Sequence, residues 1–368
     1  MERWTDAEAK AWAAGRPWIC GFNYLPPSAV NFLDMWRRDS FDRAAIERDL
    51  RWAAEIGFNA LRVNPHFLVW RHDRDGLMER LDWVMGAAAR LGLSTAPCLF
   101  DDCGFGGFEP EYAPQPDPIP GVHNSRAVAN PGRATVMDRS AWPALKAYLR
   151  DVVRTFRDDH RILFWDLYNE PGNRMIFGPD GYRTYDAALT AHSHALLKAS
   201  FRWARDVAPS QPLTVAAWST PPQGASMPPY ATDIDATALA LSDIVSFHAY
   251  WSAARVARLI ARLGARPGAS SRPMICTEWM ARAVHSRIDD QLRLFRDSGV
   301  GCFQWGLVKG RTQTHLPWPA DLVAAHGGVA TRDVWFHDLL HEDGRPFDPR
   351  EIETVKLLTG GRRTRPAI

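Results

Sequence analysis

The stretch that decides the fold is I-L-F-W-D-L-Y-N-E-P-G-N, from Ile162 to Asn173. Its first half is a short apolar run, preceded by charged residues at 157–161 and followed by a Pro-Gly pair. A run this short that stops at Pro-Gly is typical of a buried strand rather than a helix. We therefore predict a strand whose C-terminal end carries Asn169 and Glu170.

A second apolar run, P-M-I-C-T-E-W-M at residues 273–280, also ends in a carboxylate, Glu278. Taken alone, Glu170 could simply cap the next turn. In an α/β barrel, however, the C-terminal ends of the strands meet at the catalytic face. Two carboxylates that converge there suit glycosidic bond cleavage, in which one is the acid/base and the other the nucleophile.

Strand-like and helix-like segments alternate along the rest of the chain. The expected strands lie at residues 19–24, 60–63, 94–100, 162–170, 213–218, 244–250, 274–279 and 301–308. Helices are expected at 42–56, 76–91, 142–156, 185–207, 255–263 and 288–295, with closing helical turns at 333–340 and 348–358. Such alternation predicts βαβ units and a parallel sheet. The sequence therefore predicts one α/β domain over residues 1–368, a (β/α)8 TIM barrel with extended loops on its catalytic face.

Four motifs follow one another along the chain: W-D-L-Y-N-E-P, S-F-H-A-Y at 246–250, C-T-E-W, and Q-W-G at 304–306. With them, residues 18–358 resemble the clan A glycoside hydrolases, and most of all the cellulase-like family 5. The resemblance implies a retaining β-glycoside hydrolase that cleaves β-linked oligosaccharides or glycosides by double displacement. It makes Glu170 the acid/base and Glu278 the nucleophile, with carboxyl groups about 5 Å apart.

The resemblance also implies the residues that bind the sugar. Asn169 would bond the sugar 2-hydroxyl, and Arg62 would lie beside the nucleophile. His248 and Tyr250 form an H-x-Y pair whose side chains share one side of a strand. Trp305 would be the platform under the sugar.

Structural alternatives stay open for some of these residues. Arg62 could instead pair with Asp166 inside the barrel, and both contacts could exist together. Asp166 is expected to be a buried partner rather than a catalytic group, because buried carboxylates are normally paired. His248 could be a satisfied core histidine and Trp305 a core tryptophan.

Two long loops should form the walls of the substrate cleft. Residues 101–140 are rich in Pro and Gly, and residues 309–332 follow the last expected strand. A loop this long is usually functional or disordered. Four polar residues of the first loop are candidate sugar contacts, although each could be an ordinary loop residue: Asp101, Asp102, His123 and Asn124. Walls of this length are expected to block one end of the cleft, which favours exo action or a specificity for oligosaccharides.

Composition excludes several classes of partner and cofactor. The net charge is +2 without a basic stripe, so nucleic acid is not expected to bind; the basic cluster at 360–365 is expected to be a frayed terminus. No metal site or other cofactor is expected, since C-x-x-C pairs and His-rich spacings are missing. Of the five cysteines, four are expected to be small buried hydrophobes, whereas Cys103 follows a strand end and could be exposed.

The same composition bears on membranes and location. No run reaches membrane-spanning length, and the N-terminus lacks the apolar region of a signal peptide. We therefore expect no membrane contact and a cytoplasmic protein, or a secreted one if a signal was removed. The sixteen tryptophans suit a site that stacks sugar faces on aromatic rings.

Rival functions stay open at this point. The barrel could bind carbohydrate with little or no turnover, or act as an endo-β-glucanase, xylanase or mannanase on a polymer. A metal-dependent lyase would need carboxylate or histidine ligands at several strand ends, where the sequence shows one glutamate each on two strands. The sugar, the linkage and the oligomeric state are not predicted.

Overall fold

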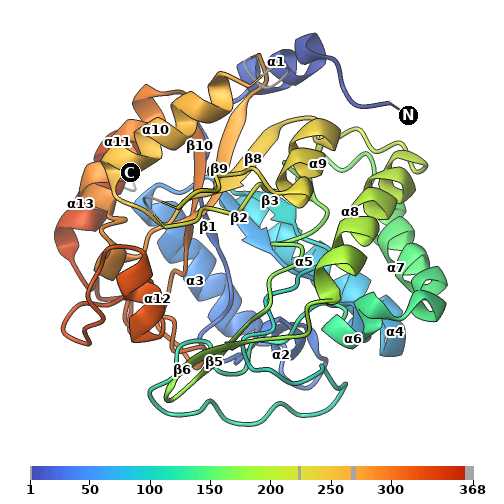
Figure 1. Cartoon of the computed structure of the whole chain (residues 1–368), viewed down its shortest axis with the longest axis horizontal. Coiled ribbons are helices and arrows are strands. Elements are labelled where there is room, and N and C mark those ends of the chain that lie inside the picture. Colours follow the sequence, from blue (N-terminus) through green and yellow to red (C-terminus); the bar gives the residue numbers. More distant parts are fainter. Residues whose placement is uncertain (1, 223–224, 267–270, 361–368) are drawn as a thin grey trace, which may run out of the picture.

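The structure, a computed structural model, describes residues 2–222, 225–266 and 271–360. In these ranges, a central barrel of eight parallel strands is surrounded by helices (Figure 1). The barrel strands are β1 (Cys20–Asn23), β2 (Ala60–Val63), β3 (Ser94–Pro97), β4 (Trp165–Asp166), β7 (Leu213–Thr214), β8 (Val245–His248), β9 (Met274–Trp279) and β10 (Gly301–Trp305).

The strands close into a ring. Six of them are hydrogen-bonded in the order β3-β2-β1-β10-β9-β8, and β4 pairs with β7. A parallel bridge between Cys98 and Asp166 joins β3 to β4, and a parallel bridge between Ala217 and Phe247 joins the segment after β7 to β8. The predicted (β/α)8 barrel is therefore confirmed.

Each strand is followed by a helix of the outer layer. These helices are α3 (Arg43–Ile56), α5 (Arg74–Arg90), α7 (Trp142–Thr155), α8 (Leu189–Arg205), α9 (Asp233–Leu241), α10 (Ala253–Gly264), α11 (Ile288–Asp297) and α13 (Pro349–Thr359). Shorter helices precede the first strand or lie in connecting segments: α1 (Asp6–Ala14), α2 (Phe32–Trp36), α4 (Phe67–His72), α6 (Arg133–Met137) and α12 (Ala320–Ala325). None of the helices in the described ranges has the length and apolarity needed to cross a bilayer.

Helix α3 shows how the sequence builds this outer layer. It begins after Asp42, whose carboxylate accepts the N–H of Ala45 at 3.0 Å, and it ends at Gly57, where φ is 109°. Its buried positions include Ile46 and Leu50, one turn apart on one face. A capped start, a left-handed glycine at the end and one apolar face are the usual elements of a helix that covers a barrel.

Packed side chains close the N-terminal end of the barrel. Trp12 of α1 lies in one apolar cluster with Phe164 and Phe303, whose rings meet edge to face at 5.8 Å. Gly21 on β1 lies against the same ring, because a Cβ there would come within 2.6 Å of Phe303. This end leaves no room for a substrate, so a site must form at the other end, where the strands have their C-terminal residues.

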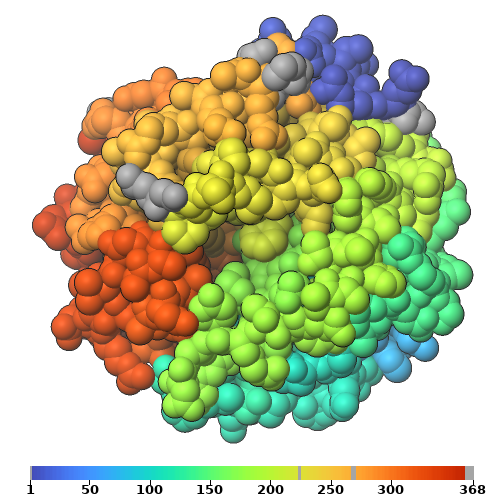
Figure 2. Space-filling view, in the orientation of Figure 1, coloured from blue at the N-terminus to red at the C-terminus, as the bar shows by residue number. Residues whose placement is uncertain are grey.

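Long segments form walls at that other end. The hairpin β5 (Met175–Gly178) and β6 (Gly181–Thr184) packs on the segment after β3, with the rings of Phe105 and Phe177 stacked at 4.4 Å. Asn124 donates its N–H to Thr312, which joins the segments that follow β3 and β10. Figure 1 shows the hairpin and α12 at this side of the barrel, and Figure 2 shows a recess between them and the segments above.

Several outer elements differ from the predictions. Residues 333–340 are not helical turns: they form an irregular segment with several bends, and Leu340 at its end makes bridges with Val308 and Pro346. The helix predicted over 185–207 begins at Leu189, and strand eight ends at Trp305.

Other elements were missing from the predictions. Helix α9 was missed because its apolar and polar residues do not separate clearly by position. The hairpin was missed although Pro-Asp-Gly between two short runs is a turn signal. Within the basic cluster, residues 361–365 lie outside the described residues.

The barrel interior contains a buried ion pair. Arg62 on β2 donates to Asp166 on β4 at 2.9 Å, and both side chains are almost completely buried. Removing one partner of such a pair leaves an uncompensated charge in a medium of low dielectric constant.

Asp166→Ala should therefore lower the free energy of unfolding by about 3–5 kcal/mol. Chemical denaturation of the native protein and the variant measures this difference. The control is Asp343→Ala, which removes the carboxylate of the exposed pair between Asp343 and Arg345 and should have little effect. Equal denaturation midpoints for the two variants would contradict the structural role of Asp166.

Candidate active site

Glu170 lies in a tight turn directly after β4. Its backbone has φ of +41°, the left-handed region that a non-glycine residue seldom occupies, and its carbonyl accepts the N–H of Asn173 at 2.9 Å, which closes the turn. One carboxylate oxygen accepts from Nδ1 of His248 at 2.8 Å. The other accepts from Nδ2 of Asn173 at 2.6 Å and from the thiol of Cys103 at 3.2 Å. Strained backbone of this kind is a feature of functional sites, where surrounding contacts hold it in place.

Glu278 lies on β9 and faces the same space. Its Oε1 accepts from Arg62 at 3.1 Å and its Oε2 accepts from the hydroxyl of Tyr250 at 2.9 Å. The side chain is 5% exposed. Since Arg62 also bonds Asp166, both alternatives for the arginine hold at once: it pairs inside the barrel and contacts the strand-end carboxylate.

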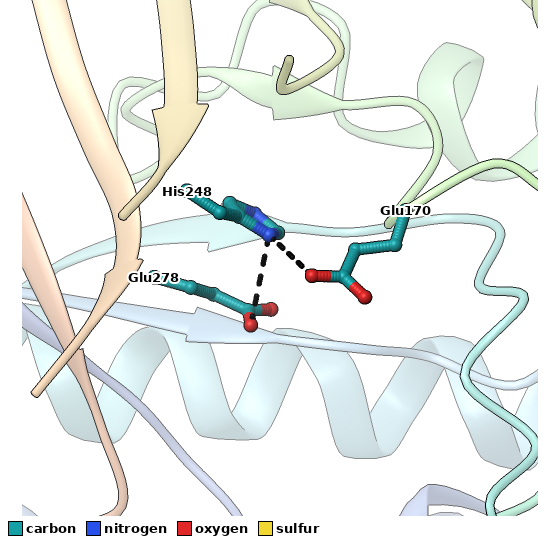
Figure 3. A group of neighbouring side chains, drawn as sticks. All are labelled: Glu170, His248 and Glu278. Carbon is teal, nitrogen blue, oxygen red and sulfur yellow. Dashed lines mark hydrogen bonds and ion pairs between the residues drawn. The ribbon is translucent and has the colours of Figure 1, made fainter. Parts of the chain in front are cut away.

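His248 lies between the two carboxylates (Figure 3). Its Nδ1 is 2.8 Å from an oxygen of Glu170 and 3.7 Å from an oxygen of Glu278, and the three atoms lie within 4.8 Å of one another. A register shift in the pairing of β8 with β9 places His248 beside Glu278. The separation of the two carboxylates agrees with the distance of about 5 Å expected for a retaining glycosidase.

The three groups control one another's protonation. Burial acts to raise the pKa of Glu170, but the hydrogen bond and charge of His248 and the bond from Asn173 bring it below its ordinary value. Burial raises the pKa of Glu278, and repulsion from Glu170 adds to it. Burial opposes the charged form of His248, yet the two carboxylates raise its pKa. The groups therefore take up and release protons as a unit.

The predicted sugar-binding residues line one cavity with the two glutamates. The cavity is about 270 Å³ in volume. Its lining includes Arg62, Asn169, His248, Tyr250, Trp305 and His123, and also Asp101 and Asn124. The amide of Asn169 is held on both sides: its Oδ1 accepts from Arg62 at 2.7 Å and its Nδ2 donates to Asp101 at 3.0 Å. Trp305 is half-buried, so one part of its ring is open to the cavity.

Asp102 is the exception, because it does not line the cavity. It is fully buried, and its oxygens accept from the hydroxyls of Tyr168 at 2.9 Å and Ser193 at 2.6 Å and from the N–H of Gly172 at 2.6 Å. Both of its carboxylate oxygens are therefore bonded to groups of the protein, beneath the turn of Glu170. The prediction that Asp102 contacts the sugar is therefore wrong, and its neighbour Asp101 faces the cavity instead.

Other residues of the site were not predicted. Cys103 is half-buried and donates to Glu170, while Asn173 supplies the second bond to the same oxygen. Asn173 had a sequence signal, since it lies three residues after Glu170 in the same turn. His337 lines the cavity from a segment that was expected to be helical.

One group of described residues could in principle hold a metal ion, and it consists of Glu170, His248 and Glu278 themselves. The guanidinium of Arg62 is 3.1 Å from Glu278 and already places positive charge against this group. A divalent metal ion bound to the same group would be repelled by this guanidinium at that distance. The permanent charge of Arg62 therefore weakens this group as a metal site.

Known proteins resemble this chain in structure rather than in sequence. No family model and no curated sequence matches it. The structure of GH5_18 from Streptomyces cattleya in complex with Manβ1-4GlcNAc has a TM-score of 0.62 and 16% identity, over 96% of this chain and 82% of that one. The endo-β-1,4-mannanase of Thermotoga petrophila has a TM-score of 0.55 and 15% identity, over 96% and 79%.

A third similar structure is the exo-β-1,4-mannosidase Op5Man5 from Opitutaceae bacterium strain TAV5, with a TM-score of 0.55 and 16% identity, over 93% of this chain and 60% of that one. The chain has the fold of the family 5 glycoside hydrolases. This confirms the fold that the four motifs implied, and the similarity extends over nearly the whole described chain.

Glu278→Gln should lower the pKa of His248, because the negative charge of Glu278 raises it in the native protein. An NMR titration of the imidazole signals measures the change. The control Asp343→Asn removes a distant exposed charge and should leave the titration unchanged. A His248 titration that is the same in Glu278→Gln and in the native protein would show that the charge of Glu278 does not act on His248.

Proposed function

We propose that this protein is a retaining β-glycoside hydrolase. The observation that carries the proposal is the pair of buried carboxylates, Glu170 and Glu278, which have one oxygen each within 4.8 Å of the other at the mouth of the barrel. An inverting enzyme keeps its carboxyl groups roughly 6.5–9.5 Å apart, to leave space for a water molecule between the sugar and the base. This pair leaves no such space, so the carboxylate itself must attack.

Glu278 is assigned as the nucleophile. Arg62 and Tyr250 hold its two oxygens from different sides, which fixes the carboxylate and favours its charged form. In the first step an oxygen of Glu278 forms a bond to the anomeric carbon while the bond to the leaving oxygen breaks. The product is a glycosyl ester on Glu278.

Glu170 is assigned as the acid/base. It must give a proton to the leaving oxygen, although its partners lower its pKa in the sugar-free site. The neighbouring His248, with its raised pKa, bonds Glu170 directly and is the nearest source of that proton. Once Glu278 has become a neutral ester, its charge no longer opposes ionisation of Glu170. Glu170 can then remove a proton from the incoming water and complete the second step.

The cavity favours a small substrate. Its volume of about 270 Å³ is near the lower end of the range for small-molecule sites. The walls after β3 and β10 meet through Asn124 and Thr312 and narrow the cleft. We therefore propose β-linked oligosaccharides or glycosides as substrates. Proteins of similar structure are an exo-β-1,4-mannosidase and a GH5_18 enzyme in complex with Manβ1-4GlcNAc, so β-mannosides are the first to test.

A panel of aryl β-glycosides and short β-linked oligosaccharides, β-mannosides included, tests the function. The native protein should hydrolyse at least one of them. Glu278→Gln should remove turnover by several orders of magnitude, because the amide keeps the shape of the side chain but cannot form the glycosyl ester. Its melting curve should stay close to that of the native protein.

The control for this variant is Glu79→Gln, which alters an exposed glutamate paired with Arg43 and should keep full activity. A near-normal kcat in Glu278→Gln, with an unchanged melting curve, would contradict the assignment of Glu278 as the nucleophile. A native protein that binds these sugars without hydrolysing any would instead indicate a carbohydrate-binding barrel.

Glu170→Ala tests the second role. The variant should lose far more activity on glycosides with poor leaving groups than on activated aryl glycosides, because only the former need a proton in the first step. Added azide, which needs no base, should restore the second step and yield a β-glycosyl azide. An α-glycosyl azide, or no effect of azide, would contradict the assignment of roles.

A further inference from the structure

Two histidines from distant parts of the chain face each other in the cavity wall. His123 comes from the segment after β3 and His337 from the segment after β10. Their ring centroids are 5.3 Å apart at an angle of 66°, and both residues line the cavity. His123 is 4% exposed and His337 is 1% exposed, so the small accessible part of each side chain lies at the cavity surface.

Hydrogen bonds fix the same tautomer in both rings. Nδ1 of His123 contacts the carbonyl of Leu316 at 2.7 Å, and Nδ1 of His337 contacts the carbonyl of Met280 at 2.5 Å. A carbonyl oxygen only accepts, so each Nδ1 carries the hydrogen. In a neutral imidazole the other nitrogen, Nε2, is then an acceptor without a hydrogen.

Both rings stay neutral over the ordinary pH range. Burial lowers the pKa of His123 to about 4, against a smaller opposing effect of the Leu316 carbonyl. Burial also lowers the pKa of His337 well below its usual value, and His123 and the guanidinium of Arg282 act in the same direction. The two Nε2 atoms are therefore acceptors under the conditions in which an enzyme works.

Neither Nε2 atom has a hydrogen-bond partner in the part of the chain that the structure describes. Neither atom is sealed inside the protein, and both residues line the cavity, so a group in the cavity, water or substrate, completes each Nε2. The completing group must be a donor, because the nitrogen has only a lone pair to offer.

The pair lies beside the proposed reacting centre. The ring of His337 is 5.7 Å from the ring of Tyr250, whose hydroxyl bonds Glu278. It also lies 6.1 Å from the ring of Trp305 and nearly parallel to it, at 24°. A sugar over Trp305 with its anomeric carbon at Glu278 therefore has its other ring positions next to the two histidines.

We propose that His123 and His337 bind two free hydroxyl groups of the sugar that Glu278 attacks, and so restrict the enzyme to terminal sugars. The inference rests on the proposed glycosidase function and deepens it. A hydroxyl donates to Nε2, but a glycosidic oxygen has no hydrogen and cannot. A sugar whose hydroxyl carries a further residue therefore leaves Nε2 unpaired, and a chain interior is rejected. The enzyme is then exo-acting.

The test uses the best aryl β-glycoside of the panel, its monodeoxy analogues and its mono-O-methyl analogues. The native enzyme should lose roughly 10-fold or more in kcat/KM at each of two ring positions, for the deoxy and the O-methyl compound alike. His337→Phe and His123→Phe keep a flat ring without the acceptor. Each variant should lose roughly 10-fold on the parent and become indifferent to deoxygenation at one of the two positions, a different one for each variant.

His315→Phe is the matched control. His315 precedes Leu316, which bonds His123, and its carbonyl accepts the N–H of Phe336, the residue before His337, but it does not line the cavity. It should keep the native pattern of discrimination. Melting curves of all variants separate a loss of fold from a loss of recognition. Variants of His123 and His337 that retain the native discrimination, or that lose activity equally on every analogue, would overturn the proposal.

Calorimetric binding of the parent and the deoxy analogues to the native protein and to Glu278→Gln separates this inference from the proposed function. Binding that weakens at the same two positions, without turnover by the native protein, would keep the histidine pair and overturn the hydrolase. Turnover with no preference at any ring position would overturn the pair alone. The absence of both binding and turnover would overturn both.

Discussion

The structure depends on the placement of one buried guanidinium. Arg62 projects from β2 into the barrel and donates to acceptors on several other strands and strand ends: Asn23, Asp166, Asn169 and Glu278. A buried charge without such partners costs several kcal/mol, so the segments that carry the acceptors must close around it. The contact that stabilises the barrel is thereby the contact that fixes the position of Glu278.

The same charge makes the close pair of carboxylates possible. Two buried carboxylates within 4.8 Å repel each other strongly unless positive charge compensates them. Arg62 supplies a permanent charge on one side of Glu278, and His248 supplies a titratable one between Glu278 and Glu170. One partner is therefore fixed and the other can exchange a proton, which is the asymmetry that a two-step displacement needs.

The sequence predicted the barrel and its two glutamates because both correspond to patterns in short, local stretches of the sequence. Eight buried strands read as apolar runs, and a carboxylate at the end of such a run is an exception that stands out. What the sequence did not predict depends on single-residue register or on the path of loops. Asp101 and Asp102 are adjacent, and the alternation of side chains sends one to the cavity and the other beneath the turn of Glu170. His337 lines the cavity from an irregular segment, 214 positions beyond His123, which it contacts, and no local sequence pattern predicts a contact over that separation.

In the proposed mechanism the sugar is transferred first to Glu278 and then to water, with two inversions at the anomeric carbon. The most direct measurement is a proton NMR time course of hydrolysis of an aryl β-glycoside by the native enzyme, followed before the product mutarotates. The carboxylate spacing predicts that the β-anomer of the free sugar forms first and that the α-anomer grows in later. An α-anomer as the first product would show a single inversion and would contradict the mechanism.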